Sequence, residues 1–333
     1  MSIHNKIVKA LILASSLILT ANTASAAKFN IAVGDGGGGT QEAIGKKFIE
    51  EFSSNTKHTA KLFLNGQLGS EQDTVNDAAM GTLDFSILAI NNVTPFSPSV
   101  GVLTLPYMIQ SLDDAITLTQ GKLGQELVEN TKRDAGVRII GWAYSGFRVL
   151  SNSKRPIKTL DDLKGLVVRV PKNEIMIETY KSWGVNPTPM AWSETFTGLQ
   201  QGVIDGQDNP YITIYAMKFD EVQKYITNVR YLFSIEPLIV SESVFQDQDK
   251  ATQAAILAAG KAATAYSAKS LVSGEAKIKA ELIKRGMEIT DPANGEKEWI
   301  EKATKAVWPK FYNSVGGKDK VNAALAILGR DKV

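Results

Sequence analysis

Apolar residues along the chain follow two patterns, short continuous runs and runs with helical spacing. The continuous runs have the length of buried strands; they cover residues 28–33, 59–64, 83–89, 137–142 and 234–241. After the first run, Ile44, Phe48 and Phe52 recur at every fourth position, which predicts an amphipathic helix that begins at Thr40. Strands and helices arranged in this way predict an α/β fold.

A much longer helical segment lies near the end of the chain. Residues 252–285 are rich in Ala, Lys and Glu, which favours one long helix. At 1.5 Å per residue it would span about 50 Å. Gly260 and Gly274 are the positions where a bend or break is expected, because glycine destabilises a helix interior.

The first 26 residues have the pattern of a cleavable secretory signal. Lys6 and Lys9 precede an apolar run at 10–19, and Ala24-Ser25-Ala26 is a small-residue cleavage sequence. The apolar run is about half as long as a membrane-spanning helix, which disfavours the alternative of a retained anchor. We therefore expect a periplasmic protein that begins at Ala27, and its remaining length suggests two domains.

Composition excludes several classes of function. The chain carries 37 Lys and Arg against 35 Asp and Glu, and loss of Lys6 and Lys9 makes the two signs equal. A neutral protein has no overall field that attracts nucleic acid, so no nucleic-acid partner is expected. Without cysteine there is no disulfide, thiolate metal site or cysteine nucleophile. After cleavage only His58 remains, which we predict at the surface, so we expect no metal, no cofactor and no catalytic triad.

A glycine-rich segment follows the first predicted strand. Gly34, Gly36 and Gly39 match the G-x-G-x-x-G pattern of dinucleotide-binding folds. However, the second strand ends in Asn65-Gly66 instead of the acidic residue that would bind a ribose, and no P-loop lysine follows. We predict instead a helix start whose free backbone N–H groups, with Asp35 and Gly36, lie beside a cleft. The alternative is a flexible turn without a ligand.

Two arginines and an asparagine lie near the ends of short apolar runs. Arg169 follows residues 166–168, and Asn209 follows residues 203–205. In open α/β sheets, ligands bind beyond the carboxyl ends of the strands. A guanidinium group there can bind a carboxylate through two hydrogen bonds, so Arg169 is the first candidate. The alternative for this arginine is a structural salt bridge.

The other two candidates have alternatives of the same kind. Arg148 would add a second charged contact, or would form an ion pair between lobes. Asn209 would donate its amide to the carboxylate, or would cap the turn before Pro210. Asp205 and Asp208 would repel an anion, so we expect them to be loop and helix-start residues; the alternative is a solute that also carries amines or hydroxyl groups.

A series of motifs in a fixed order resembles the DctP-type periplasmic solute-binding subunits of TRAP transporters. The motifs are Gly66-Gln67-Leu68-Gly69-Ser70-Glu71, Leu105-Pro106-Tyr107, Gly146-Phe147-Arg148, Arg169-Val170-Pro171, Pro187-Thr188-Pro189-Met190 and Asp205 to Pro210. The resemblance implies a two-lobed periplasmic binding protein of type II-like fold, with an interlobe cleft, hinge strands and a long helix spanning both lobes. It also implies that residues 27–145 and about 234–273 form lobe I, and that residues about 146–233 and 274–333 form lobe II.

The resemblance extends the candidate site. It implies that Trp192 covers the ligand, although a buried core tryptophan is the alternative. It also implies ligand contacts from Glu71 and from the segment Ala89 to Asn91. Glu71 has an alternative role as a carboxylate favoured at a helix start. Some relatives carry an acid at the position of Ala89, and the apolar residue here disfavours solutes that need a cationic or polyol partner at that point.

The predicted function is therefore non-enzymatic. The protein would capture a carboxylate-bearing organic acid between two closing lobes, and would deliver it as a monomer to the small and large membrane subunits of the transporter. Dicarboxylates, sugar acids, sialic acid and small hydroxy or keto acids all fit the arginine pair. One rival is the binding protein of an ABC importer, against which the motifs argue. A second rival, a secreted hydrolase or dehydrogenase, would need a nucleophile–base pair or a metal.

Overall fold

The computed structural model describes residues 26–333. Nearly all of the predicted signal segment thus lies outside the described residues. One mixed sheet has the strand order β10-β8-β4-β9-β3-β1-β2, with β7 paired to β4, and β5 and β6 form a separate pair. The strands are β1 (Lys28–Val33), β2 (Thr59–Phe63), β3 (Phe85–Ile87), β4 (Val137–Asn152), β5 (Arg169–Val170), β6 (Thr188–Pro189), β7 (Gly206–Pro210), β8 (Tyr225–Thr227), β9 (Phe233–Ser241) and β10 (Glu288–Thr290).

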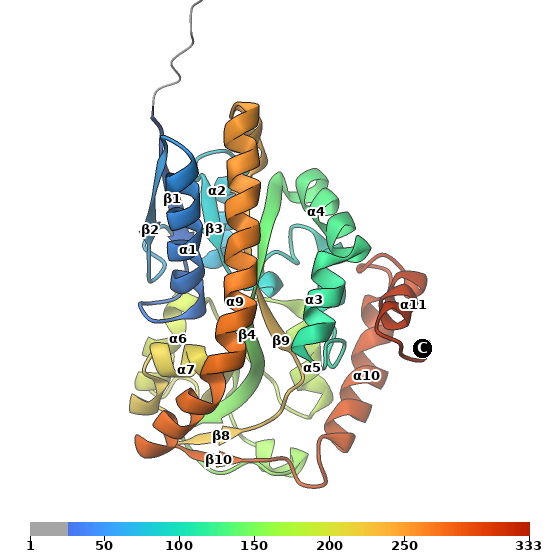
Figure 1. The fold of residues 1–333 in the computed structure, drawn as a ribbon. Coiled ribbons are helices and arrows are strands. Elements are labelled where there is room, and N and C mark those ends of the chain that lie inside the picture. The colour runs from blue at the N-terminus through green and yellow to red at the C-terminus, as the bar shows by residue number, and fades with distance from the viewer. Residues whose placement is uncertain (1–25) are drawn as a thin grey trace, which may run out of the picture.

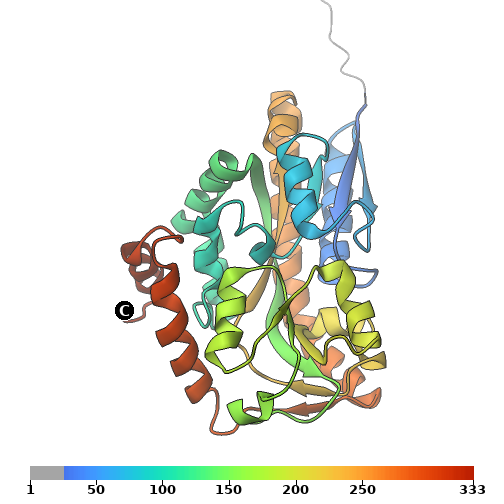
Figure 2. The ribbon, with the colours of Figure 1, turned by 180° about the vertical axis from the view of Figure 1, so that it is seen from behind.

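Helices cover both faces of this sheet, and the molecule has the two-lobed α/β architecture predicted from the resemblance (Figure 1, Figure 2). The α-helices are α1 (Thr40–Asn55), α2 (Glu71–Ala79), α3 (Leu112–Gln120), α4 (Lys122–Ala135), α5 (Glu174–Ser182), α6 (Trp192–Gln200), α7 (Tyr211–Ala216), α8 (Glu242–Gln246), α9 (Lys250–Lys284), α10 (Lys297–Phe311) and α11 (Lys318–Ile327). Short 3-10 helices occupy Ile90–Asn92, Pro98–Thr104, Leu160–Leu163 and Phe219–Glu221. Ile44, Phe48 and Phe52 of α1 are buried, as their spacing predicted.

Strand β4 joins the two lobes. Its first part pairs with β9 over Val137 to Phe147, and its last part pairs with β7 and β8 over Arg148 to Asn152. The prediction of a strand that ends at residue 142 was therefore wrong. The strand continues because the residues near its C-terminal end are buried in the second lobe, where Val149 and Leu150 are 1% and 2% exposed.

The long helix is confirmed as α9, which runs the length of both lobes in front of β4 and β9 (Figure 1). No break occurs at Gly260 or Gly274. Gly260 instead permits close packing, because a Cβ atom there would lie 2.1 Å from the carbonyl oxygen of Ile140 on β4. Below this contact the Ser267 hydroxyl accepts a hydrogen bond of 2.6 Å from the backbone N–H of Tyr144. The helix is thus bonded directly to the strand that connects the lobes.

The C-terminal helices contact both lobes. Trp299 at the start of α10 packs with Tyr180 and Trp183 of the second lobe. Trp308 near the end of α10 belongs instead to the core that contains α3 and α4, as does Leu325 of α11. The sequence had placed residues 274–333 in the second lobe alone. These contacts tie the tail to both lobes, while the proposed lobe boundaries remain a prediction.

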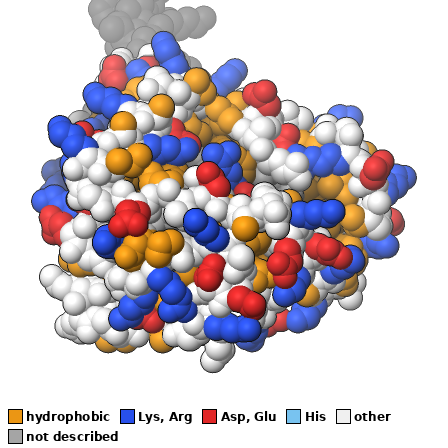
Figure 3. All heavy atoms as spheres, turned by 90° about the horizontal axis from the view of Figure 1, so that it is seen from below, with side chains coloured by type: hydrophobic (Ala, Val, Ile, Leu, Met, Phe, Trp, Pro, Cys, Tyr) orange, Lys and Arg blue, Asp and Glu red, His pale blue; other side chains and the backbone are white. Residues whose placement is uncertain are grey.

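The prediction that His58 lies at the surface was wrong. The side chain is only 5% exposed and stacks on Phe52, and its Nδ1 accepts a hydrogen bond of 2.9 Å from the backbone N–H of Ala27. Neighbouring polar residues hid this position, because the apolar partners come from α1 and β1. On the outside of the molecule, side chains of both charges are interspersed over the face that Figure 3 presents. None of the helices in residues 26–333 is long and apolar enough to cross a membrane.

Candidate functional site

A polar site lies between the lobes, and it brings together every predicted site residue except Gly36. The residues that line it are Asp35, Gln41, Glu71, Ala89, Asn91, Asn92, Arg148, Arg169, Pro171, Trp192, Asn209, Thr213 and Glu236. They come from the loop after β1, from α1, α2 and the segment after β3, and from β4, β5, α6, β7, α7 and β9. Asp35, Ala89 and Pro171 follow the ends of strands, as expected for an α/β sheet, and four others lie near the starts of helices.

The glycine-rich loop does not present free N–H groups to this site, contrary to the prediction. The backbone N–H groups of Gly34 and Asp35 both donate to Gln41 Oε1 at 3.0 Å. Gly36 donates to the sulfur of Met217 at 3.2 Å and so contacts the second lobe outside the site. The predicted helix does begin at Thr40, but of this segment only Asp35 lines the interlobe site.

The lobes are closed over the site. Besides the contact between Gly36 and Met217, Gln72 Nε2 donates to the carbonyl oxygen of Lys172 at 2.9 Å. The volume enclosed between the lining side chains is about 20 Å³. This space has room for about one water molecule and not for an organic acid.

Arg169 occupies the position that its motif predicted. It is the first residue of β5, is 2% exposed, and donates from Nε and Nη2 to the carbonyl oxygen of Met190 at 3.0 and 2.8 Å. Nη1 has no hydrogen-bond partner within residues 26–333. Burial, and then the charge of Arg148, lower the pKa of Arg169 to about 10. The side chain remains a cation at neutral pH and is oriented by the protein, with one arm free.

Arg148 forms a buried ion pair with Asp208. The guanidinium Nε and Nη2 lie 3.2 Å from the two carboxylate oxygens, and Nη2 also donates to the Asp208 carbonyl oxygen at 2.5 Å. Tyr231 donates its hydroxyl to the same carboxylate. Burial lowers the pKa of Arg148, but the charge of Asp208 outweighs it and holds the pKa above its usual value. Arg148 is therefore ion-paired, but its partner lies within the same predicted lobe, so this is not the expected ion pair between lobes, and Arg148 still lines the site.

Two predictions about this segment were wrong. Asp208 is not a helix-start residue, because it lies within β7 and is fully buried. The strand also begins at Gly206, after the short run Val203-Ile204-Asp205 that was expected to precede Asn209 as its strand. The hydrophobic pattern misled the prediction because β7 is a polar strand whose side chains are satisfied by Arg148, Ser151 and one another.

Asparagine side chains supply neutral donors. Asn209 Nδ2 donates to Gln207 Oε1 at 2.6 Å and lines the site from β7. Asn91 Nδ2 is buried and has no hydrogen-bond partner among the described residues. Because an unpaired buried donor is costly, Asn91 is ready to donate to a molecule in the site. Trp192 is half-buried beside Phe219, with Arg169 5.6 Å from its ring centre, so it is both a packing residue and a wall of the site.

Opposite the arginines, three carboxyl groups surround one glutamine. Gln41 Nε2 donates to Glu71 Oε1 and to Glu236 Oε2, both at 3.0 Å. Burial, and then the charge of Glu236, raise the pKa of Glu71 to about 7. Burial, followed by the charges of Glu236 and Glu71, raises the pKa of Asp35 well above its usual range. This wall can accept hydrogen bonds from hydroxyl groups, and part of it holds protons near neutral pH.

Sequence reasoning missed Gln41, Asn92 and Glu236. Asn92 donates to Glu71, and Ser234 donates to Glu236 at 2.9 Å. The signal for Glu236 was present, because an acidic residue inside an apolar strand must find a partner. The inference that Ala89 disfavours a polyol does not hold either. Ala89 is apolar, but its backbone N–H donates to Glu71, which supplies the acidic group at that point.

Comparison with known proteins agrees with this architecture. A family model described as DctP, bacterial extracellular solute-binding protein, family 7, matches residues 39–314. A solute-binding protein from Verminephrobacter eiseniae is 34% identical over 247 residues, which cover 73% of this chain and 73% of the relative.

Solved structures of TRAP periplasmic solute-binding proteins also match. An open, ligand-free protein from Rhodobacter sphaeroides is 37% identical, with a TM-score of 0.74 and coverage of 91% of this chain and 99% of that one. A protein from Roseobacter denitrificans with bound L-galactonate is 29% identical, with a TM-score of 0.84 and coverage of 90% and 98%. The less identical but ligand-bound structure superposes better, in accord with the closed lobes seen here.

Proposed function

Because the chain belongs to the DctP family of bacterial extracellular solute-binding proteins, the periplasmic subunits of TRAP transporters, we propose that it captures a sugar acid. The observation that carries this proposal is the pairing of two buried arginines with a wall of three carboxyl groups across one site. Such a site suits a solute with an anionic group at one end and hydroxyl groups along its length.

The carboxylate of the solute would bind at the arginine wall. Arg169 has a free arm, Arg148 lies beside it, and Asn209 and Asn91 add amide donors. Hydrogen bonds between a guanidinium and a carboxylate are stronger than neutral ones, and burial strengthens them further. This wall sets the requirement for an organic anion.

The hydroxyl groups would bind at the acidic wall. Glu71, Glu236 and Asp35 present acceptor oxygens, and each carboxylate can accept more hydrogen bonds than the protein supplies, so hydroxyl groups of a solute would add donors. A simple fatty acid would place an apolar chain against these groups and add no donor. A dicarboxylate would bring a second anion against them. The wall therefore selects polyhydroxylated monocarboxylates, as in the Roseobacter denitrificans protein that holds L-galactonate.

The wider role follows from the family. The protein would act in the periplasm as a monomer and would pass the acid to the small and large membrane subunits without chemical turnover. Lobe opening about β4, β9 and α9 would release the acid, and the solute would favour the closed state because it contacts both lobes only there.

The test is a thermal-shift comparison of three probes on protein freed of ligand by denaturation and refolding. L-galactonate carries both features, galactitol carries the hydroxyl groups without the carboxylate, and hexanoate carries the carboxylate without hydroxyl groups. A molecule that binds only the native state stabilises it, by about 2.7 kcal/mol when its free concentration is 100 times its Kd. The melting temperature rises as a result. We expect a shift with L-galactonate, or with another sugar acid in a panel of aldonates and uronates, and none with the two partial probes.

Two outcomes would contradict the proposal in different ways. A shift with galactitol as large as with any acid would show that the arginines do not select an anion. A shift with hexanoate or succinate but with no sugar acid would show that the carboxyl groups do not select hydroxyl groups.

A further inference from the structure

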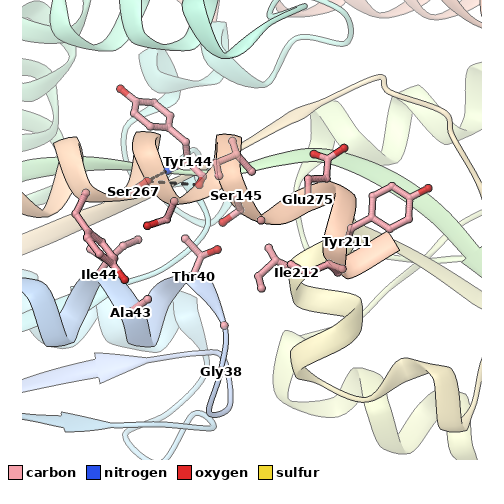
Figure 4. Close-up of a pocket in the computed structure, with 16 residues that line it drawn as sticks. Gly38, Thr40, Ala43, Ile44, Tyr144, Ser145, Tyr211, Ile212, Ser267 and Glu275 are labelled. Atoms are coloured by element: carbon pink, nitrogen blue, oxygen red, sulfur yellow. Dashed lines mark hydrogen bonds between the residues drawn. The ribbon is translucent and has the colours of Figure 1, made fainter. Parts of the chain in front are cut away.

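A second cavity lies at the hinge, apart from the interlobe site. Its volume is about 140 Å³, and it shares no lining residue with that site. Figure 4 shows its walls: Thr40 and Ile44 from α1, Ser145 from β4, Ile212 from α7 and Glu275 from α9. The first lobe, the second lobe and both connecting elements therefore meet around this space.

The Ser145 hydroxyl lacks a partner in this cavity. The residue is 3% exposed, and its Oγ has no hydrogen bond within the described residues. Its neighbour on the cavity wall, Ser267, is satisfied through the backbone N–H of Tyr144. Buried hydroxyl groups are nearly always paired, because leaving one unpaired is costly. The unpaired hydroxyl of Ser145 therefore indicates that a molecule bound in the cavity would form a hydrogen bond with it.

The remaining walls indicate what kind of molecule this is. Apolar atoms predominate, from Ala43 and Ile44 on α1 and from Leu271 and Ile278 on α9. A dry apolar cavity of about 150 Å³ holds one benzene ring, so this space fits a single ring. The only carboxylate on the wall, that of Glu275, is paired with Lys279 at 2.7 Å, so the lining offers no unpaired charge for an ionic group.

A groove on the surface gives access. It runs between α1 and α9 and is lined by Glu42, Lys46, Lys47 and Glu50. Tyr266, which is 42% exposed, belongs to the wall of both the groove and the cavity. A small molecule can therefore reach the cavity along α1 past a tyrosine side chain, without passing through the interlobe site.

We propose that the hinge cavity is a binding site for a small uncharged molecule that consists of an apolar ring with one hydroxyl group. Its hydroxyl forms a hydrogen bond with Ser145 Oγ, and its ring packs against Ile44, Leu271 and Ile278. Because α1 and α7 belong to different lobes, the bound molecule contacts both of them and the hinge helix at once.

The experiment uses phenol and benzene as probes of the intact protein, with affinity measured by calorimetry and position by a crystal structure. Gly274 lines the cavity from α9, and Gly274→Leu would fill it, so phenol binding should be lost. Ala276→Leu, two residues along the same helix at an exposed position, is the matched control and should bind phenol as the parent does. Far-ultraviolet circular dichroism and the melting temperature verify the fold of each variant.

A second variant tests the hydrogen bond. Ser145→Ala removes the hydroxyl and little volume, so phenol should bind about five- to tenfold more weakly, the effect of one hydrogen bond, while benzene binding stays unchanged. Equal phenol affinity in Gly274→Leu and in the parent would overturn the proposal. So would an equal effect of Ser145→Ala on both probes, or a crystal structure in which only water occupies the cavity.

Discussion

The two walls of the interlobe site satisfy their charges in different ways. On the arginine wall, Arg148 is neutralised by Asp208, and Arg169 is held by the carbonyl oxygen of Met190. On the acidic wall, Glu71 and Glu236 both accept a hydrogen bond from the amide group of Gln41. Burial raises the pKa of Asp35, and this residue lies close enough for the charges of Glu236 and Glu71 to raise it further. The first wall pairs its cations and keeps an arm of Arg169 free, whereas the second places several carboxyl groups close together around one glutamine.

We infer from this difference that the arginine wall positions the solute and that the acidic wall responds to it. The arginines are fixed before binding, so they lose little freedom when a carboxylate arrives. The charged carboxyl groups repel one another in the closed site. This repulsion is reduced when they take up protons, or is offset when hydroxyl groups donate hydrogen bonds to them. The arginine wall should therefore control affinity and stability, and the acidic wall should control pH dependence and the choice among acids.

The largest effect is expected from Arg148→Ala on stability. The change leaves Asp208 buried without its cation, which costs about 3–5 kcal/mol of the free energy of unfolding. Urea denaturation of the ligand-free protein measures it. Lys164→Ala is the matched control, because Lys164 forms an exposed ion pair with Asp161, and its loss should leave the free energy of unfolding close to that of the parent. Equal losses in the two variants would show that the Arg148 pair carries no special weight.

Arg169→Ala should act on affinity instead. Removal of this cation from a buried site should weaken binding of the acid found in the thermal-shift screen by about 2–5 kcal/mol. The fold should survive, because Arg169 bonds only to one backbone carbonyl and lines the cleft. Calorimetry measures the affinity, and Arg169→Lys, which keeps the charge but loses the fork, should fall between parent and alanine variant. Unchanged affinity in Arg169→Ala would remove this residue from the site.

The acidic wall predicts a pH dependence of binding. A solvated glutamate has a pKa of 4.5, and Glu71 in the closed site has a pKa of about 7. Closure over the acid therefore takes up a proton between these two pH values. Over the pH range in which the solute stays ionised, affinity should fall as pH rises through about 7, by at most about tenfold per pH unit for one proton. The raised pKa of Asp35 acts in the same direction.

Calorimetry in two buffers of different ionisation enthalpy counts the protons directly. Parent protein at pH 6 should take up protons on binding, and Glu71→Gln should take up fewer. Arg169→Lys serves as the control, because it changes affinity without removing a carboxyl group. Proton release on binding, or an uptake that Glu71→Gln leaves unchanged, would contradict the assignment of proton uptake to this wall.

The sequence predicted the arginine wall much better than the acidic one, for a physical reason. Arg148, Arg169 and Asn209 each lie in a short motif with an apolar run before it, so local pattern was enough to find them. The partners that hold them were not predictable in the same way. Asp208 was assigned to a helix start, because a polar strand such as β7 carries no hydrophobic period.

The acidic wall depends on contacts between distant segments. Gln41 meets Glu236 across a separation of 195 residues, and nothing near Gln41 in the sequence shows it. Strands β1, β2, β3 and β9 were predictable from their apolar runs, α1 from the spacing of its apolar residues, and α9 from its content of Ala, Lys and Glu. The extent of β4 was not, since its second half pairs with β7 and β8, which come much later.

Trp192→Phe should give the smallest effect, and it tests whether the walls act independently. Trp192 lies beside both of them: Arg169 lies over its ring at 5.6 Å, and its side chain is close enough to Asp35 to offset in part the rise that burial causes in the pKa of that carboxyl. Phenylalanine keeps an aromatic face for the cation but loses the N–H, so acid affinity should fall by no more than about 1 kcal/mol. Calorimetry of Trp192→Phe alone, and combined with Arg169→Lys or Glu71→Gln, measures the coupling.

Independent walls predict that Trp192→Phe adds to Arg169→Lys within about 0.5 kcal/mol, and that its coupling is confined to Glu71→Gln. The reason is that the lost N–H belongs to the acidic wall alone, where it helps to compensate Asp35. Strong coupling to Arg169→Lys would mean instead that Trp192 links the two walls. Protonation of the carboxyl groups would then also change how strongly the arginines bind the carboxylate of the solute.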